Sequence, residues 1–239
     1  MNKYVAIILA SRDTNEFDRL YTMYTLEQGL VRAVAKGARK PAAKLTGHLE
    51  PGTLSEVYVA RARGMGQITG AITLDGFENI KKDFAGLSEF LKIAKFFLKN
   101  FAEGEKDERV FELSKDFLGN LGNWEDRENG DDKAKVLIEA FWWKLFDALG
   151  ARPEVMKCAS CRKKLAEKTK KFFSAEKGGV VCAVCGPQFR ETIPVSDNQI
   201  KLLRVFWGNP LVKIAKVKTE KGELEKLEKT RESFEKYVF

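Results

Sequence analysis

Four cysteines carry the clearest chemistry in this 239-residue chain. They form two C-x2-C pairs, Cys158 with Cys161 and Cys182 with Cys185, separated by twenty residues. A two-residue gap lets both thiolates of a pair turn toward one ion about 2.3 Å away, and two such pairs complete a tetrahedron. We therefore expect one structural zinc ion, because four thiolates leave no coordination position open for a substrate. The alternatives are two reduced pairs or redox-active cysteines, but no thioredoxin-like pattern of strand and helix surrounds either pair.

A second cluster consists of positive charges in a stretch that contains no acid. Residues 28–49 read QGLVRAVAKGARKPAAKLTGHL, and the cations are Arg32, Lys36, Arg39, Lys40 and Lys44. The whole chain has 42 basic and 34 acidic residues and a net charge of +8, so the absence of acids here is local. Clustered cations bind a phosphate backbone independently of base sequence, because each neutralised phosphate releases condensed counterions. We expect these five residues to bind nucleic acid; the alternative is a solvated loop whose cations serve solubility.

Motifs that would indicate catalysis are weak. His48 and Glu50 match only the H-x-E half of a zinc deaminase pattern, and the first cysteine pair follows Lys157 where that pattern requires proline. The glycines at 64, 66 and 70 lack the spacing of a dinucleotide-binding loop and better indicate a hairpin turn. The chain has a single histidine and no P-loop motif. We expect His48 to be a loop histidine, and we expect no enzyme activity.

The basic stretch lies in a region that predicts five short strands. Runs rich in β-branched, aromatic or alternating residues occur at 4–10, 20–26, 30–36, 54–60 and 67–74. In the last run, Ile68, Gly70, Ile72 and Leu74 would share one face of the strand. Five strands in about 80 residues is the size of a small closed barrel such as an OB-fold. Tyr21 and Tyr24 are conceivable base-stacking platforms, although positions in the barrel core or on its surface are the commoner places for such residues.

Helical periodicity replaces the strand pattern after residue 80. Apolar residues recur at helical spacing over 84–101, 110–121 and 137–149, and 195–207 and 222–238 also predict helices. The phenylalanine-rich stripes indicate the core of a helix bundle rather than a ligand-binding box. Residues 123–132 predict a loop, and residues 171–181 predict a ribbon hairpin that leads into the second cysteine pair.

We therefore expect an α+β protein with two domains. An N-terminal β-barrel OB-fold would occupy residues 1–80 and bind nucleic acid. An all-α domain would occupy residues 81–239, with a four-cysteine zinc ribbon inserted at about 155–190. The first apolar run, residues 4–10, is too short for a signal peptide or a membrane span, and no later segment reaches eighteen apolar residues. We expect a soluble, cytoplasmic protein without a membrane partner.

The order of these features resembles the bacterial recombination mediator family RecO. The resemblance begins at EFDRL (16–20), continues through Tyr24-Thr25 and Gly29, and is strongest at VAKGARK (34–40) and LTGHLEP (45–51). The two cysteine pairs extend it into the C-terminal half. One departure is Arg162, which stands directly after the second cysteine where the family often has glycine. Some members of the family lack zinc, so the metal is not what makes their function.

The resemblance implies an OB-fold, a helical domain and an embedded zinc site. It implies binding of single- and double-stranded DNA and annealing of complementary strands. With a RecR-like partner, such a protein helps to load RecA onto DNA coated with single-strand-binding protein (SSB). The acidic C-terminal tail of SSB would recruit it, and it would associate with the nucleoid during repair. The alternative from another class is an RNA-associated OB and zinc-ribbon accessory protein of translation or transcription, which a competition between DNA and RNA would separate. A third alternative, a zinc-dependent enzyme, would need an open metal position.

Overall fold

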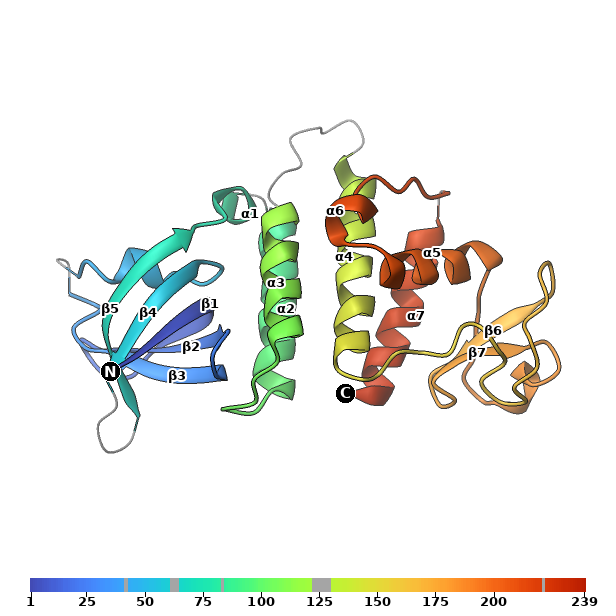
Figure 1. Cartoon of the computed structure of the whole chain (residues 1–239), viewed down its shortest axis with the longest axis horizontal. Helices are drawn as coiled ribbons and strands as arrows, with labels where there is room; N and C mark the ends of the chain where they lie inside the picture. The colour runs from blue at the N-terminus through green and yellow to red at the C-terminus, as the bar shows by residue number, and fades with distance from the viewer. Residues whose placement is uncertain (41–42, 61–64, 83, 122–129, 221) are drawn as a thin grey trace. The chain divides into compact units, whose positions relative to one another are not determined.

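The computed structural model describes residues 1–40, 43–60, 65–82, 84–121, 130–220 and 222–239. The chain divides into two compact units, residues 1–123 and residues 124–239, and each unit is described by itself (Figure 1). The first unit therefore extends past residue 80, where the sequence places the boundary between the domains. That boundary stays a prediction.

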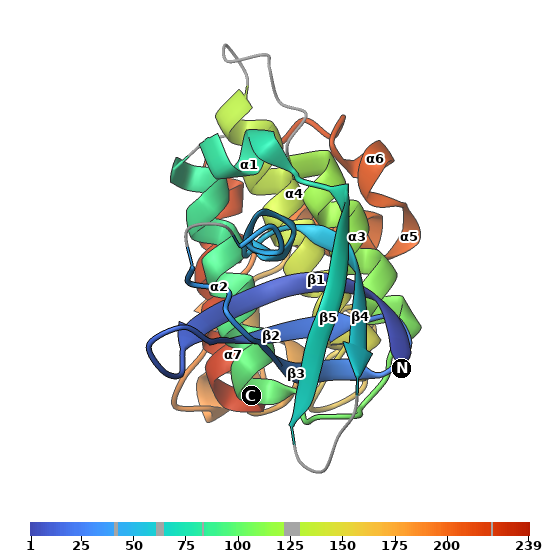
Figure 2. The ribbon, with the colours of Figure 1, turned by 90° about the vertical axis from the view of Figure 1, so that its left-hand side faces the viewer.

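The first unit contains a closed five-stranded barrel with the strand order β1-β2-β3-β5-β4. The strands are β1 (Asn2–Asp13), β2 (Arg19–Thr25), β3 (Gly29–Ala35), β4 (Leu54–Ala60) and β5 (Gly66–Asp75). All neighbouring strands are antiparallel except β3 and β5, which pair in parallel only through Ala33 with Gly66 and Val34 with Gln67. In Figure 2, β4 and β5 cross over β1, β2 and β3, as in a small barrel that closes on itself. The expected OB-like barrel is confirmed.

Two tyrosines of β2 lie in the core and not on a free surface. Tyr21 is 1% exposed and points into the barrel among its buried side chains. Tyr24 is fully buried on the opposite side of the strand, where its ring packs edge-on against Phe97 and Phe101 at centroid distances of 4.8 and 5.3 Å. Neither ring is available to stack on a base, so both tyrosines are core residues rather than base-stacking platforms.

The alternation expected along β5 is interrupted. The pairing with β4 shifts register between Tyr58 and Val59, so that Thr69 becomes an extra residue in a β-bulge. A bulge of one residue exchanges the two faces of the strand beyond it. Ala71 is therefore buried, whereas Ile72 and Leu74 are 54% and 52% exposed. The prediction that Ile68, Gly70, Ile72 and Leu74 share one face was therefore wrong, because Ile68 is buried whereas Ile72 and Leu74 are exposed.

Among its described residues, three α-helices complete the first unit. They are α1 (Glu78–Lys82), α2 (Phe84–Asn100) and α3 (Glu108–Leu121), and the two longer ones confirm the expected helical stretches. Their apolar stripes are buried, with Phe90, Phe97, Phe111 and Phe117 each at most 1% exposed. The stripes thus form a core, and Tyr24 joins the barrel to it.

In the part of it that the structure describes, the second unit combines four α-helices with a small ribbon. The helices are α4 (Gly130–Ala148), α5 (Asp197–Gly208), α6 (Leu211–Ile214) and α7 (Glu223–Val238). The ribbon consists of β6 (Lys171–Ser174), β7 (Gly179–Cys182) and β8 (Ile193–Pro194), in the order β7-β6-β8. Along the chain, the short helix η2 (Gly186–Gln188) lies between β7 and β8. The expected ribbon hairpin and the expected helices are confirmed. Most of the loop expected at 123–132 lies outside the described residues, but residues 130–132 belong to α4 and not to a loop.

Aromatic stacking and a buried ion pair hold α4 to α7. Trp143 and Phe234 stack with ring centroids 5.8 Å apart. Nearby, Arg231 Nε lies 3.0 Å from Glu139 Oε1, and both side chains are more than nine-tenths buried. Burial raises the pKa of Glu139 to about 7, while the charge of Arg231 acts in the opposite direction. Among the described residues, no helix has both the length and the apolar character needed to cross a membrane.

Candidate nucleic-acid interface and metal centre

The four cysteines come together at one end of the ribbon hairpin. The Sγ atoms of Cys158, Cys161, Cys182 and Cys185 all lie within 4.8 Å of one another. The Cys161 and Cys182 sulfurs, which belong to different pairs, are 3.9 Å apart. Four sulfurs about 2.3 Å from a central zinc ion would form a tetrahedron with edges of roughly 3.8 Å. The geometry is therefore compatible with one zinc ion held by four thiolates.

Backbone N–H groups of the two C-x2-C pairs stabilise negative charge on the Cys158 sulfur. The N–H groups of Cys161 and Cys182 both donate to Cys158 Sγ at 3.4 Å. Burial acts to raise the pKa of Cys158, but the donated hydrogen bonds together bring it down to about 6. Burial raises the pKa of Cys185 to about 12, so that thiol needs a cation beside it to ionise. The four sulfur ligands thus suit a metal ion that prefers thiolates, such as zinc.

Two residues, Arg162 and Lys171, shape the local structure around the cysteine pairs. Arg162, directly after the first pair, has a φ of 62°, and its N–H donates to Cys158 O at 2.9 Å. Glycine adopts this left-handed conformation without steric cost, which gives a physical reason for glycine at this position. Lys171, at the start of β6, is 3% exposed and bonds Asp197 Oδ1 of α5 at 2.8 Å. That ion pair fastens the ribbon to the helices of its own unit.

The basic stretch forms the end of β3 and the loop that leaves it. Gly37 has a φ of 68°, and its N–H donates to Asp18 Oδ1 at 2.8 Å. Ala38 is buried in the barrel core, and the Thr46 hydroxyl donates to its carbonyl at 2.9 Å. These bonds hold residues 36–40 and 43–46 against the barrel, with the charged side chains of Lys36, Arg39, Lys40 and Lys44 exposed.

Two of the five predicted cations are already paired with acids from elsewhere in the sequence. Arg32 Nη1 lies 3.2 Å from Glu103 Oε1. Arg39 Nε lies 3.3 Å from Asp13 Oδ2, and its Nη1 donates to Asn15 O at 3.0 Å. The stretch is free of acids in sequence, but folding brings carboxylates to it.

The other three predicted cations are exposed lysines. Within the described parts of the chain, Lys36, Lys40 and Lys44 form no ion pair. Lys40 Nζ lies 5.5 Å from the centroid of the Phe17 ring, which is itself 46% exposed. Phe17 is thus an exposed aromatic beside Lys40, and sequence reasoning missed it even though it stands in the EFDRL motif.

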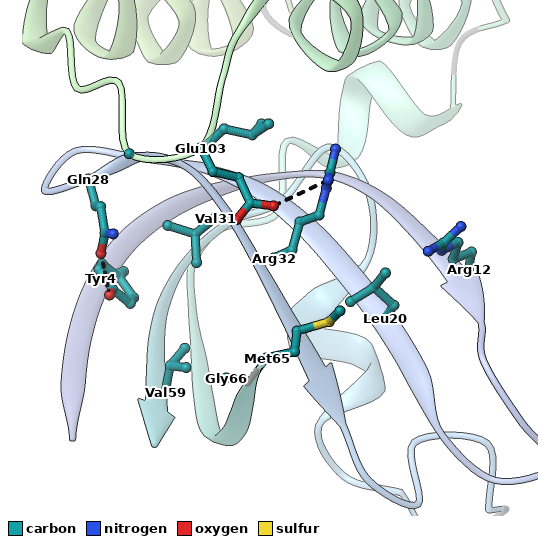
Figure 3. A pocket seen from close by; sticks show the side chains of 12 residues that line it. Tyr4, Arg12, Leu20, Gln28, Val31, Arg32, Val59, Met65, Gly66 and Glu103 are labelled. Atoms are coloured by element: carbon teal, nitrogen blue, oxygen red, sulfur yellow. Dashed lines mark hydrogen bonds and ion pairs between the residues drawn. The ribbon is translucent and has the colours of Figure 1, made fainter. Parts of the chain in front are cut away.

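A pocket of about 500 Å³ opens on the barrel beside β3 (Figure 3). Its lining includes Arg12, Leu20, Arg32, Met65 and Glu103. Arg12 pairs across the strands with Leu20, and Arg32 pairs with Thr22 two residues farther along β2, so both arginines lie on the outer face of the sheet. Arg12 is exposed and was also missed, because nothing in its neighbourhood in the sequence marks it as basic.

His48 has a structural role. It lies in the short helix η1 (Thr46–Leu49) rather than in an open loop. Its Nδ1 accepts a hydrogen bond from the Thr73 N–H at 3.3 Å and lies 2.9 Å from the Thr73 hydroxyl oxygen. The ring thereby fastens η1 to β5. In the part of the chain that the structure describes, the histidine belongs to no group that could hold a metal ion.

Comparisons with known proteins agree with this architecture. A family model described as recombination protein O, N terminal, matches residues 1–77, and one described as recombination protein O, C terminal, matches residues 82–237. DNA repair protein RecO of Dehalococcoides mccartyi (strain CBDB1) is 34% identical over 230 residues, which are 95% of this chain and 86% of that protein. DNA repair protein RecO of Desulforamulus reducens is 29% identical over 218 residues, 90% of this chain and 81% of that protein. DNA repair protein RecO of Roseiflexus sp. (strain RS-1) is 33% identical over 206 residues, 86% of this chain and 70% of that protein.

Proposed function

Because the chain belongs to the RecO family of recombination proteins, we propose that it is a non-enzymatic DNA repair mediator that binds DNA through its barrel. The observation that carries the proposal is the loop after β3, where Lys36, Lys40 and Lys44 are exposed without an ion pair among the described residues. OB-folds bind nucleic-acid strands on the face and loops of such a barrel. Arg32 and Arg39 belong to the same surface, but each must share its charge with a carboxylate.

Lysine side chains of this kind suit binding that ignores base sequence. Each ammonium group is a point charge on a flexible stem, and it gains affinity by displacing counterions from phosphates. Such contacts do not distinguish single strands from duplexes or one sequence from another, which a protein that anneals complementary strands requires. Phe17, exposed beside Lys40, offers an aromatic face for an unpaired base. Stacking on Phe17 would favour single strands over duplexes.

The finer parts of the role concern partners. We propose that the protein anneals complementary strands and, with a RecR-like partner, helps RecA to replace SSB on single-stranded DNA. The net charge of +8 favours encounter with the acidic C-terminal tail of SSB. The protein would work in the cytoplasm, at the nucleoid, and would need no catalytic residue, since each step exchanges non-covalent contacts.

The cysteine cluster would hold one structural zinc ion. All four cysteines would be ligands, and the ion would supply the charge that stabilises their thiolates. No position is left for water or substrate. The metal would therefore fold the ribbon and contribute nothing directly to DNA binding, in agreement with the separation of the cysteines and the basic loop into different compact units.

The decisive experiment is annealing of complementary DNA strands precoated with SSB, measured with and without this protein. We expect acceleration with full-length SSB and little with SSB that lacks its acidic tail. A competition between DNA and RNA of the same sequence tests the alternative. If annealing of coated strands is not accelerated and RNA competes better than DNA, the protein is an RNA-associated factor and the mediator proposal fails.

A further inference from the structure

Glu103 reaches the basic surface from the segment between α2 and α3. The segment lies along the edge of β3: Glu103 forms isolated bridges with Gly29 and Leu30, and the Gly104 N–H donates to Leu30 O at 3.3 Å. Gly29 makes the approach possible. Its φ is 66°, and a Cβ atom there would lie 1.9 Å from the carbonyl oxygen of Glu105. The backbone under Glu103 is thus fixed against the barrel.

The Glu103 side chain pairs with Arg32 at the pocket beside β3. Its Oε1 lies 3.2 Å from Arg32 Nη1, and Figure 3 shows the contact among the side chains that line the pocket. The two side chains are 55% and 44% exposed, so water competes for both. An exposed ion pair of this kind is weak and exchanges its partners readily. Only the glutamate side chain has to move to release Arg32.

We infer that the Glu103 carboxylate occupies the place of a DNA phosphate on Arg32 and thereby limits the affinity of the barrel. The inference rests on the proposed DNA binding by the same surface. Carboxylate and phosphate oxygens are equivalent acceptors for a guanidinium group, so one can replace the other on Arg32. Two anions cannot share it without repulsion, so a phosphate enters as the carboxylate leaves.

Arg12 gives the surface a second cation. It lines the same pocket, is exposed, and has no ion pair among the described residues. It lies on β1, whereas Arg32 lies on β3, and β2 runs between them. Strands are spaced about 4.8 Å apart, so the two arginines flank a track roughly 10 Å wide at the backbone. A phosphate that displaces Glu103 meets Arg32 at the edge of β3, and Arg12 offers the same DNA strand a further contact on the opposite side of Arg32 (Figure 3).

This arrangement gives the surface a built-in means of release. A bound strand must compete with Glu103 at every moment, so it dissociates faster than from an uncontested Arg32. A protein that hands DNA to another protein needs such exchange, whereas a simple storage protein does not. Glu103 is in this sense an affinity-determining residue and not a direct DNA contact.

The test is Glu103→Gln, which keeps the size of the side chain and removes its charge. A unit charge about 6 Å from a phosphate in water changes the affinity by roughly threefold, so we expect ~3-fold tighter binding of a single-stranded oligonucleotide at low salt. Slower dissociation should account for most of the change. In an Arg32→Gln background the same Glu103→Gln change should have a smaller effect, because no competition for Arg32 is left and only the repulsion between carboxylate and phosphate is removed.

Glu105→Gln is the matched control. Glu105 is exposed on the same segment, and its carboxylate accepts from the Ala102 N–H rather than pairing with an arginine. We expect it to alter affinity by much less than Glu103→Gln, with thermal melting used to show that every variant is folded. If the two variants tighten binding equally, net charge explains the gain and the inference is overturned. If the wild-type protein binds DNA but Glu103→Gln does not differ from it, the inference fails alone; if the wild-type protein binds no DNA, the proposed function fails with it.

Discussion

Removal of the three unpaired lysines tests the DNA-binding surface most directly. The change is Lys36→Ala, Lys40→Ala and Lys44→Ala in one variant. These side chains are exposed and, within the described chain, form no ion pair, so each is free to neutralise a phosphate. Arg39 is left in place because its bonds to Asp13 and Asn15 fasten the loop to β1 and to the turn after it.

The magnitude follows from counterion release. On single-stranded DNA each phosphate contact contributes a slope of about 0.7 to the fall of log affinity with log salt, so three contacts contribute about 2. Raising the salt from about 50 to 200 mM should therefore cost the wild-type protein roughly 20-fold more affinity than the triple variant. At low salt, the variant should bind every sequence more weakly and by the same factor. Exposed substitutions of this kind change the free energy of unfolding by about 0.5 kcal/mol or less, so the fold should survive.

The assay is fluorescence anisotropy of labelled oligonucleotides titrated at several salt concentrations. A control variant, Lys213→Ala, Lys216→Ala and Lys218→Ala, removes the same three charges from exposed positions in and after α6. We expect the control to keep most of the wild-type slope. Equal slopes for the wild-type protein and the Lys36, Lys40 and Lys44 variant would refute the reasoning. Equal losses in both variants would mean that net charge, and not this loop, governs binding.

The metal centre and the ribbon around it give three further predictions. Cys158→Ser or Cys182→Ser should abolish the expected single zinc ion, shown by elemental analysis, and lower Tm by roughly 10 °C, because metal binding and folding are coupled. Arg162→Gly should raise the free energy of unfolding by ~0.5 kcal/mol in urea titrations. Glycine relieves the strain at a φ of 62°, but its larger loss of conformational entropy on folding offsets part of this stabilisation. Asp197→Asn should cost about 3 kcal/mol at pH 7, because it leaves the buried Lys171 without its anion. The hydrogen bond from Lys171 holds the pKa of Asp197 below its ordinary value, so this stability is present above the unfolded-state pKa and lost as pH falls through the folded one. Unfolding curves for wild type and Asp197→Asn should thus converge in acid, and a constant gap would contradict the assignment.

The clustering of the four cysteines could be predicted from the sequence because its geometry is local. Two residues between cysteines suffice to turn both sulfurs of a pair inward, and the hairpin of β6 and β7 brings the pairs together. The closed barrel was predictable for a similar reason, since strand periodicity and turns are local signals. What a local signal cannot reveal is an extra residue in a strand. The bulge at Thr69 left Ile72 and Leu74 outside, although their spacing from Ile68 matched a core face.

The charges of the site show the same limit more sharply. A stretch that excludes carboxylates from its own sequence can still meet them in space, and the acids that pair with Arg32 and Arg39 come from a helix connection and from β1. The second cation of the pocket was hidden in the same way: a register shift between Ile8 and Ala10 precedes Arg12, which then pairs with Leu20. Pairing in a barrel is a long-range property, so no window along the chain contains both partners. The basic stretch thus identifies the surface. Only the fold shows that Arg32 and Arg39 are paired with carboxylates, whereas Lys36, Lys40 and Lys44 form no ion pair among the described residues.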